Sequence, residues 1–294
     1  MNASVAYSPK KDDLFFPCKN AQFFSTGAPT SDAALCVELA RLAYCRSDAN
    51  FAFDQARIRT ELERIGFTAT GFFESQDTPQ GGGTHCFLAM SQDQQLAVAA
   101  FRGTDGRDAT DLGDDADAVP VSWNHGGKVH RGFARGLAEV QVAVEQALQS
   151  IQCRLLFTGH SLGAALATLL ASIKKAPDAA LYTFGSPLVG DADFVAGLKD
   201  VRNYRYVDCC DIVTRIPPKA LGYRHLGQPY YIAQDRSVAF DPGDNFIKID
   251  RIEAFLEYPF KYHAWRNDHV GVRELADHAP VNYVSAVTAA TPPA

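Results

Sequence analysis

The sequence predicts an α/β protein whose central, mostly parallel sheet is covered by helices on both faces. Short apolar runs typical of strands alternate with helical segments along most of the chain. A short apolar run, a Gly-His-Ser-Leu-Gly turn and an Ala/Leu-rich helical segment follow one another in residues 155–170. No low-complexity linker and no internal repeat divides the 294 residues, so we expect one domain over residues 1–294.

The chain begins irregularly and then becomes helical. Residues 1–30 contain scattered prolines and no periodicity, which predicts an irregular N-terminal arm. Ser31 or Asp32 then caps a helix that carries leucines at helical spacing on one face. A second helix is expected at residues 54–65, where Gly66 ends it.

The pattern then changes to short strands. Strands are expected at 67–74, 85–90 and 96–101, followed by a long loop over 104–128 and one helix over 133–151. Beyond Ser161 the alternation resumes. Strands are expected at 181–184, 202–207, 223–232 and 236–240, and helices at 192–199, 245–257 and 281–290.

The turn at residues 159–163 places one serine between a strand and a helix. Gly159 and Gly163 have no side chains, so the strand and the helix can approach closely while the serine hydroxyl is presented. The N-terminus of the following helix adds partial positive charge where an oxyanion would form. The pentapeptide alone arises by chance in roughly one such chain in ten. Its strand-turn-helix context favours a nucleophile at Ser161 over a serine that only caps a helix.

A serine hydroxyl becomes a good nucleophile only when a base takes its proton and a carboxylate orients that base. On an elbow of this kind the acid and then the histidine follow the serine along the chain. The acid candidates are Asp191, Asp193, Asp200, Asp208 and Asp211. Asp211 is favoured because it follows a predicted strand and begins a turn that contains two prolines.

The histidines that follow the serine are the candidate bases. They are His225, His263, His269 and His278. His278 is favoured because it lies in the loop before the last predicted helix, and His269 is the second choice. His225, in a strand-like run, is expected to make a structural hydrogen bond, and His160 is expected to point away from the serine.

Backbone N–H groups are needed to stabilise the oxyanion of an ester reaction. We expect one from Leu162, directly after the serine, and one from the end of the earlier strand. That strand ends in Phe101-Arg102-Gly103-Thr104, so Thr104 could supply both an N–H and a hydroxyl.

Composition excludes some classes of protein. The net charge of −6 gives no basic excess for neutralising phosphates, so nucleic acid is not an expected partner. The N-terminus lacks the apolar core of a secretory signal and no apolar run could span a bilayer, which predicts a cytoplasmic protein. Seven irregularly spaced cysteines indicate buried thiols, and Cys209-Cys210 has no partner pair for a zinc site. No metal or organic cofactor is expected.

Four segments together resemble the class 3 lipases, the fungal-type triacylglycerol lipase family of α/β-hydrolases. They are residues 99–104, 129–133, 158–167 and 183–190. The resemblance covers about residues 31–290 and implies an α/β-hydrolase fold with its nucleophile elbow at Ser161.

Carried onto this sequence, the resemblance implies Ser161 as nucleophile, Asp211 as acid and His278 as base. It also implies Thr104 and Leu162 as the oxyanion positions. His130 and the Gly185-Ser186-Pro187 turn match segments that are mainly structural in the family.

The family's lid would fall in residues 105–122. In lipases the lid is an amphipathic helix, but residues 105–117 hold six aspartates and two glycines, which departs from a lipid-facing lid. The order of the aspartates does not match a calcium loop, so a solvated acidic loop is the preferred interpretation.

These observations predict a serine carboxylic ester hydrolase of lipase type, acting on acylglycerols or short- to medium-chain esters. Its expected partners are a lipid or small-molecule ester and, transiently, a lipid surface. A phospholipase A1 and a feruloyl or aryl esterase are alternatives with the same triad. A catalytically silent binding protein on the same fold is a remote third alternative.

Overall fold

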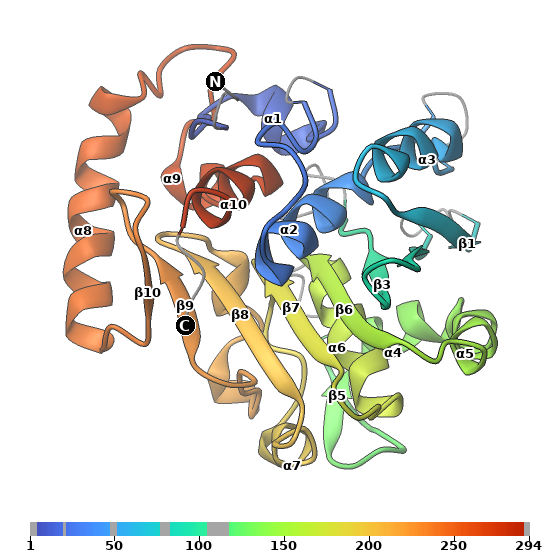
Figure 1. The fold of residues 1–294 in the computed structure, drawn as a ribbon. Helices are drawn as coiled ribbons and strands as arrows, with labels where there is room; N and C mark the ends of the chain where they lie inside the picture. The colour runs from blue at the N-terminus through green and yellow to red at the C-terminus, as the bar shows by residue number, and fades with distance from the viewer. Residues whose placement is uncertain (1–4, 20–21, 48–51, 77–82, 105–117, 291–294) are drawn as a thin grey trace.

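An extended mixed sheet forms the centre of the molecule (Figure 1). The computed structural model describes residues 5–19, 22–47, 52–76, 83–104 and 118–290. Within these residues one sheet has the strand order β1-β2-β3-β6-β7-β8-β9-β10. Its strands are β1 (Thr68–Glu74), β2 (His85–Ser91), β3 (Leu96–Phe101), β6 (Arg154–His160), β7 (Ala180–Phe184), β8 (Arg202–Asp208), β9 (Pro229–Ile232) and β10 (Val238–Phe240).

The middle of this sheet is parallel, as the sequence predicts. β3, β6, β7, β8 and β9 pair in parallel, whereas β1, β2 and β10 pair antiparallel at the two margins. The carboxyl ends of the parallel strands therefore meet at one edge, which is where ligands bind in open α/β sheets.

Helices cover both faces of the sheet. One face is covered by α2 (Asp32–Leu42), α3 (Gln55–Glu63) and α10 (Pro280–Val287). The other is covered by α4 (Arg131–Ala138), α5 (Gln141–Gln149), α6 (Leu162–Ile173) and α7 (Ala192–Ala196). Figure 1 shows α8 (Asp244–Lys261) at the outer margin beside β10. Short α1 (Lys11–Phe15) and α9 (Arg273–Ala276) lie near α10.

The strand β6 explains why both faces must be covered. Leu155 and Phe157 belong to the core under α6, whereas Leu156 belongs to the core under α2. Successive side chains of a strand point to opposite faces, so an apolar run is stable only between two layers.

The expected single helix over 133–151 is wrong. The structure has two helices, α4 and α5, separated by a turn at Glu139 and Val140. This turn buries Val140 and brings the Glu139 carboxylate to the backbone N–H of Thr84, from which it accepts a hydrogen bond of 3.1 Å. Both contacts lie outside the local sequence, so helical propensity could not predict the break.

The N-terminal arm is also less irregular than expected. It contains α1, and Leu14, Phe23 and Phe24 are buried in the cores. The backbone N–H of Ser8 donates to Asn282 on α10 at 2.7 Å. The segment is thus part of the packed structure.

The loops after β3 and β8 differ from the expectation as well. In the predicted loop 104–128, β4 (Pro120–Ser122) pairs with β5 (Lys128–His130) as a small antiparallel sheet. Most of the lid-like loop 105–122 lies outside the described residues. The strand expected at 223–232 is limited to β9, and 3₁₀ turns at Val213–Arg215 and Lys219–Leu221 precede it.

Candidate active site

The turn between β6 and α6 holds Ser161 in a strained backbone. Its φ of 57° and ψ of −129° lie in a region that non-glycine residues rarely adopt. A Cβ on Gly159 would lie 2.3 Å from the carbonyl oxygen of Gly163. A Cβ on Gly163 would lie 2.3 Å from the carbonyl oxygen of Phe101. Glycine is therefore required at both positions because backbone segments meet there.

Three side chains from distant parts of the chain form one hydrogen-bonded series at the carboxyl edge of the sheet. The Ser161 hydroxyl donates to Nε2 of His278 at 2.9 Å. Nδ1 of His278 donates to Asp211 at 2.9 Å from Oδ2 and 3.0 Å from Oδ1. The hydroxyl, a base and a carboxylate that orients the base are arranged as a nucleophilic triad requires.

The Asp211 carboxylate is held by two further groups. Its Oδ1 accepts from the backbone N–H of Val213 at 2.9 Å, and its Oδ2 accepts from the Tyr283 hydroxyl at 2.6 Å. The same hydroxyl accepts from the backbone N–H of Asp208 at 3.0 Å. Tyr283 therefore ties the end of β8 to α10, a role that sequence reasoning did not assign to it. The sequence held no local signal for this contact, because Tyr283 and Asp211 are 72 positions apart.

Gly185, in the turn after β7, also belongs to this site. Its φ is +60°, and a Cβ there would lie 2.8 Å from Oδ2 of Asp211 and 3.1 Å from Nδ1 of His278. Only glycine leaves room for the acid and base to meet, so the Gly-Ser-Pro turn acts directly on the triad geometry.

The two expected oxyanion residues lie on segments that touch. Leu162 is the first residue of α6, where backbone N–H groups have no partner within the helix. Thr104 follows β3, whose end lies against the elbow: a Cβ on Gly103 would be 2.5 Å from the carbonyl oxygen of His160. Among the described residues, the buried Thr104 hydroxyl has no hydrogen-bond partner. An unsatisfied buried donor beside the nucleophile is a group available to a developing negative charge.

His160 has a structural environment. Its Nδ1 lies 2.8 Å from the Tyr44 hydroxyl, and its ring centroid is 4.5 Å from that of His278. Burial lowers the pKa of His160 well below its usual value, and the neighbouring His278 lowers it further. A neutral ring at this point avoids placing a second positive charge beside the base.

The remaining candidates are engaged elsewhere. Asp191 caps α7, and Asp208 accepts two hydrogen bonds of 2.8 Å from Arg236. Nδ1 of His269 lies 2.6 Å from the carbonyl oxygen of Tyr262, and Nε2 of His225 lies 2.8 Å from that of Thr214. Asp193, Asp200 and His263 are exposed.

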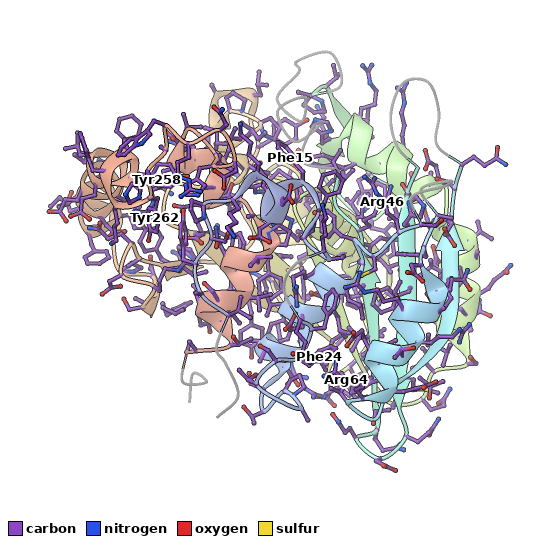
Figure 2. All side chains as sticks on the ribbon, turned by 90° about the horizontal axis from the view of Figure 1, so that it is seen from above. Phe15, Phe24, Arg46, Arg64, Tyr258 and Tyr262 are labelled. Atoms are coloured by element: carbon purple, nitrogen blue, oxygen red, sulfur yellow. The ribbon has the colours of Figure 1, made fainter. Side chains whose placement is uncertain are left out.

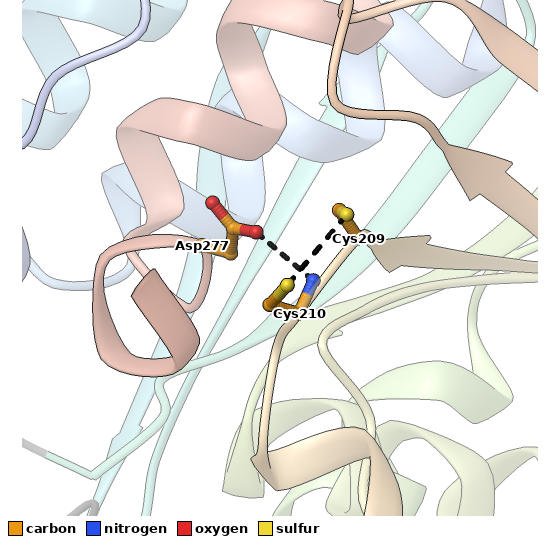
Figure 3. Close-up of side chains that lie close together, drawn as sticks. All are labelled: Cys209, Cys210 and Asp277. Atoms are coloured by element: carbon orange, nitrogen blue, oxygen red, sulfur yellow. Dashed lines mark hydrogen bonds between the residues drawn. The ribbon is translucent and has the colours of Figure 1, made fainter. Parts of the chain in front are cut away.

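A buried polar cluster lies directly behind the acid and the base. Cys209, Cys210 and Asp277 come together there, with one ligand atom of each within 4.8 Å of the others (Figure 3). However, Asp277 already accepts hydrogen bonds from the Cys210 backbone N–H at 2.9 Å, from Arg273 at 3.0 Å and from the Tyr7 hydroxyl at 2.8 Å.

The thiols of this cluster are also unsuited to a metal. The hydrogen bond between Cys209 and Cys210 and burial raise the pKa of Cys209, and its Sγ lies 3.1 Å from Oδ2 of Asp250. Metal binding requires thiolates and free carboxylate oxygens. The cluster instead links the turn after β8, which carries Asp211, to the loop that carries His278.

The triad is closed to solvent in this structure. Ser161 and Asp211 have no exposed surface, and His278 is 2% exposed.

The sheet order, the elbow and the placement of the three side chains define an α/β-hydrolase with a serine–histidine–aspartate site. Residues 98–221 match the family model described as lipase (class 3). This match covers 124 of the 294 residues, and over it the chain is similar to the class 3 lipases.

Two curated relatives of this chain are fungal lipases. A lipase of Rhizomucor miehei is 32% identical over 168 residues, which cover 52% of this chain and 46% of that protein. A secreted mono- and diacylglycerol lipase A of Penicillium camembertii is 30% identical over 200 residues, covering 63% of this chain and 62% of that protein. The matches thus span about half to three fifths of the relatives' own length.

Solved structures give the same fold. The Rhizomucor miehei lipase propeptide complex superimposes with a TM-score of 0.53 at 27% identity, covering 68% of this chain and 66% of that chain. A triacylglycerol lipase whose structure is described as having a serine protease triad superimposes with a TM-score of 0.53 at 26% identity. The match covers 67% of this chain and 77% of that chain.

Two findings concern the cellular location of the protein. Within the described residues, none of the helices combines the length and the apolarity needed to cross a membrane. The Penicillium relative is named as secreted, so the expected cytoplasmic location finds no support here.

Proposed function

We propose that this protein hydrolyses lipid carboxylic esters, with Ser161 as nucleophile, His278 as general base and Asp211 as the acid that orients the base. The observation that carries the proposal is the unbroken hydrogen-bond series from the serine hydroxyl through the imidazole to the carboxylate. We further propose that one catalytic domain carries this activity.

The proposed reaction has two halves. The Ser161 hydroxyl attacks the ester carbonyl while its proton passes to Nε2 of His278, and a tetrahedral oxyanion forms. The intermediate collapses to an acyl-serine, and the alcohol leaves with the proton from His278. A water molecule then gives a proton to the same nitrogen as it attacks the acyl-serine, and a second tetrahedral intermediate forms. This intermediate loses the Ser161 oxygen, which takes the proton back from His278 as the carboxylic acid is released.

The other groups assist at defined points. Backbone N–H groups of Thr104 and Leu162, with the unpartnered Thr104 hydroxyl, would hold the oxyanion between β3 and α6. Asp211 keeps the imidazole in the tautomer whose Nε2 accepts the proton, and it stabilises the imidazolium that results. No metal or organic cofactor enters these steps.

The relatives support lipid esters as the substrate class. They are named as lipases and as mono- and diacylglycerol lipases, and we propose acylglycerols or shorter esters for this chain on that basis. Phospholipase A1 and feruloyl esterase activities use the same triad, so they are distinguished by substrate only.

The test compares Ser161→Ala with Ser150→Ala, a matched change of an exposed serine at the end of α5. Ser161→Ala should abolish hydrolysis of nitrophenyl esters and labelling by a serine-directed fluorophosphonate, while Ser150→Ala retains both. Retained activity in folded Ser161→Ala would refute the assignment. A series of nitrophenyl esters, triglyceride emulsions, phospholipids and feruloyl esters then identifies the substrate class.

A further inference from the structure

The N-terminal arm lies against the C-terminal segment of the chain. The side-chain amide of the buried Asn282, on α10, accepts a hydrogen bond from the backbone N–H of Ser8 at 2.7 Å and donates one to the carbonyl oxygen of Ser8 at 2.9 Å. On the other side of the arm, the backbone N–H of Val270 donates to the carbonyl oxygen of Pro9 at 2.8 Å. These bonds fix the backbone directly after Tyr7.

Tyr7 lies where the arm meets the loop before α10. Its hydroxyl donates to Oδ1 of Asp277 at 2.8 Å. The Tyr7 ring is 4.6 Å from the Tyr262 ring, centroid to centroid, and the guanidinium carbons of Arg236 and Arg273 lie 5.0 and 5.8 Å from the Tyr7 centroid. Burial and the Asp277 carboxylate raise the pKa of Tyr7 well above its usual value. The hydroxyl therefore keeps its proton and remains a donor at neutral pH.

Asp277 connects the segments that carry the acid and the base. It directly precedes His278 in the sequence. Its Oδ2 accepts a hydrogen bond of 2.9 Å from the backbone N–H of Cys210, which directly precedes Asp211 (Figure 3). One carboxylate is thus a single residue away from both members of the acid–base pair. A displacement of Asp277 would change the contact between them.

The two oxygens of the Asp277 carboxylate have different partners. Oδ2 accepts from Cys210 and also from Nε of Arg273 at 3.0 Å, whereas among the described residues Oδ1 accepts only from Tyr7. Asp277 has no exposed surface, so loss of the Tyr7 hydroxyl would leave a buried oxygen without a donor. We expect the carboxylate then to turn towards another donor and to weaken its bond to Cys210.

We propose that Tyr7 is a positioning residue for ester hydrolysis, which acts through Asp277 on the contact between Asp211 and His278. The inference rests on the proposed function, which supplies the roles of the acid and the base. The Tyr7 hydroxyl bonds to Asp277 and not to the triad, so it acts by fixing geometry alone. Small displacements of reacting groups lower reaction rates strongly. Residues 270 positions apart in the sequence therefore belong to one catalytic unit.

The first test removes only the hydroxyl. Tyr7→Phe keeps the ring and therefore its packing on Tyr262, Arg236 and Arg273. The matched control is Tyr262→Phe, because the Tyr262 side chain belongs to the same aromatic cluster and makes no hydrogen bond among the described residues. Figure 2 shows Tyr262 beside Tyr258, and their ring centroids are 5.4 Å apart.

The expected change is in turnover and not in substrate binding. With nitrophenyl butyrate, Tyr7→Phe should lower kcat about tenfold and leave KM within about twofold of the parent value. Tyr262→Phe should keep both. The variants are compared at a temperature at which circular dichroism shows a folded protein, so that loss of folded enzyme does not contribute.

Proton NMR reports the geometry of the pair without turnover. A proton on Nδ1 of His278 that bonds to Asp211 should give a resonance far downfield, and its absence in His278→Ala identifies it. Tyr7→Phe should shift or broaden this resonance, whereas Tyr262→Phe should leave it unchanged. A purely stabilising role of Tyr7 would not move a resonance of the folded protein.

A double-mutant cycle tests whether Tyr7 acts through Asp277. Asp277→Asn keeps the shape of the side chain and removes its charge. Tyr7→Phe should lower kcat about tenfold in the parent but less than about twofold in the Asp277→Asn background. Equal effects in the two backgrounds would overturn the proposed route. The kinetic and NMR comparisons of Tyr7→Phe with Tyr262→Phe do not depend on the folding of Asp277→Asn.

The inference and the proposed function fail separately. Tyr7→Phe with the parent's kcat, or with an unmoved His278 resonance, would overturn the inference, and so would an equal loss of kcat in Tyr262→Phe. Absence of ester hydrolysis in the parent would remove the proposed function. The His278 resonance would still show whether Tyr7 holds the acid–base pair in place.

Discussion

The Thr104 hydroxyl allows a prediction in which activity and stability change in opposite directions. It is buried, and among the described residues it has no hydrogen-bond partner. Replacing Thr104 with valine keeps the shape of the side chain and exchanges only the hydroxyl for a methyl group. The substitution therefore removes a candidate oxyanion donor without removing any hydrogen bond from the resting protein.

The expected magnitudes follow from this environment. Loss of one oxyanion donor typically costs about 100- to 1,000-fold in kcat. We expect the lower end of this range, about 100-fold, because the Thr104 backbone N–H remains. A buried hydroxyl without a partner costs about 1–3 kcal/mol of folding free energy. Thr104→Val should therefore raise the free energy of unfolding by about 1 kcal/mol.

Two measurements check the prediction. Steady-state hydrolysis of nitrophenyl butyrate gives kcat, and urea denaturation gives the free energy of unfolding. Thr104→Ser is the matched control, since it keeps the hydroxyl and should keep kcat near the parent value. A valine variant with kcat within threefold of the parent value would refute the role of the hydroxyl in oxyanion binding. A valine variant that is less stable than the parent would show that the hydroxyl has a hydrogen-bond partner in the resting protein.

Three further predictions concern other groups. Tyr283→Phe removes the donor to Asp211 and should lower the free energy of unfolding by about 2 kcal/mol, with a reduced kcat, as urea denaturation and ester hydrolysis will show. Gly185→Ala would place a Cβ 2.8 Å from Oδ2 of Asp211 and should lower kcat at least about tenfold in a protein with unchanged circular dichroism. Full activity of Gly185→Ala would mean that catalysis does not need the close contact between Asp211 and His278. Burial lowers the pKa of His225 well below its usual value, and Arg205 lowers it further. The unfolded chain therefore takes up a proton below about pH 6.5 that the folded protein excludes, and stability falls as the pH falls. His225→Gln should remove up to about 1.4 kcal/mol per pH unit from that slope between about pH 7 and 5, and an unchanged slope would contradict this.

The sequence alone was sufficient for the elbow and for the class of fold. The strand, the glycine turn at Gly159 and Gly163, and the helix after Ser161 are contiguous, so local propensity and spacing determine them. The parallel centre of the sheet follows from the alternation of strands and helices. The turn after β8 and the loop before α10 also marked Asp211 and His278 as candidates, but His269 remained open.

Tertiary structure decided which candidates meet and what holds them. His278 lies 117 positions from Ser161 and 67 from Asp211 in the sequence, and neither hydrogen bond has a local signature. The same is true of the Tyr283 contact to Asp211 and of the close approach at Gly185. In each case the partners are brought together by the order and spacing of strands in the sheet.

Burial is the other property that the sequence could not supply. The Asp211 carboxylate is buried, whereas Ile252 and Leu256 on α8 are exposed, although a short sequence window does not distinguish these environments. The free energy of a charged or apolar side chain depends on what surrounds it, and those surroundings come from distant segments. The sequence therefore determined the elbow that presents Ser161, whereas the tertiary structure determined its hydrogen-bond partners and which side chains are buried.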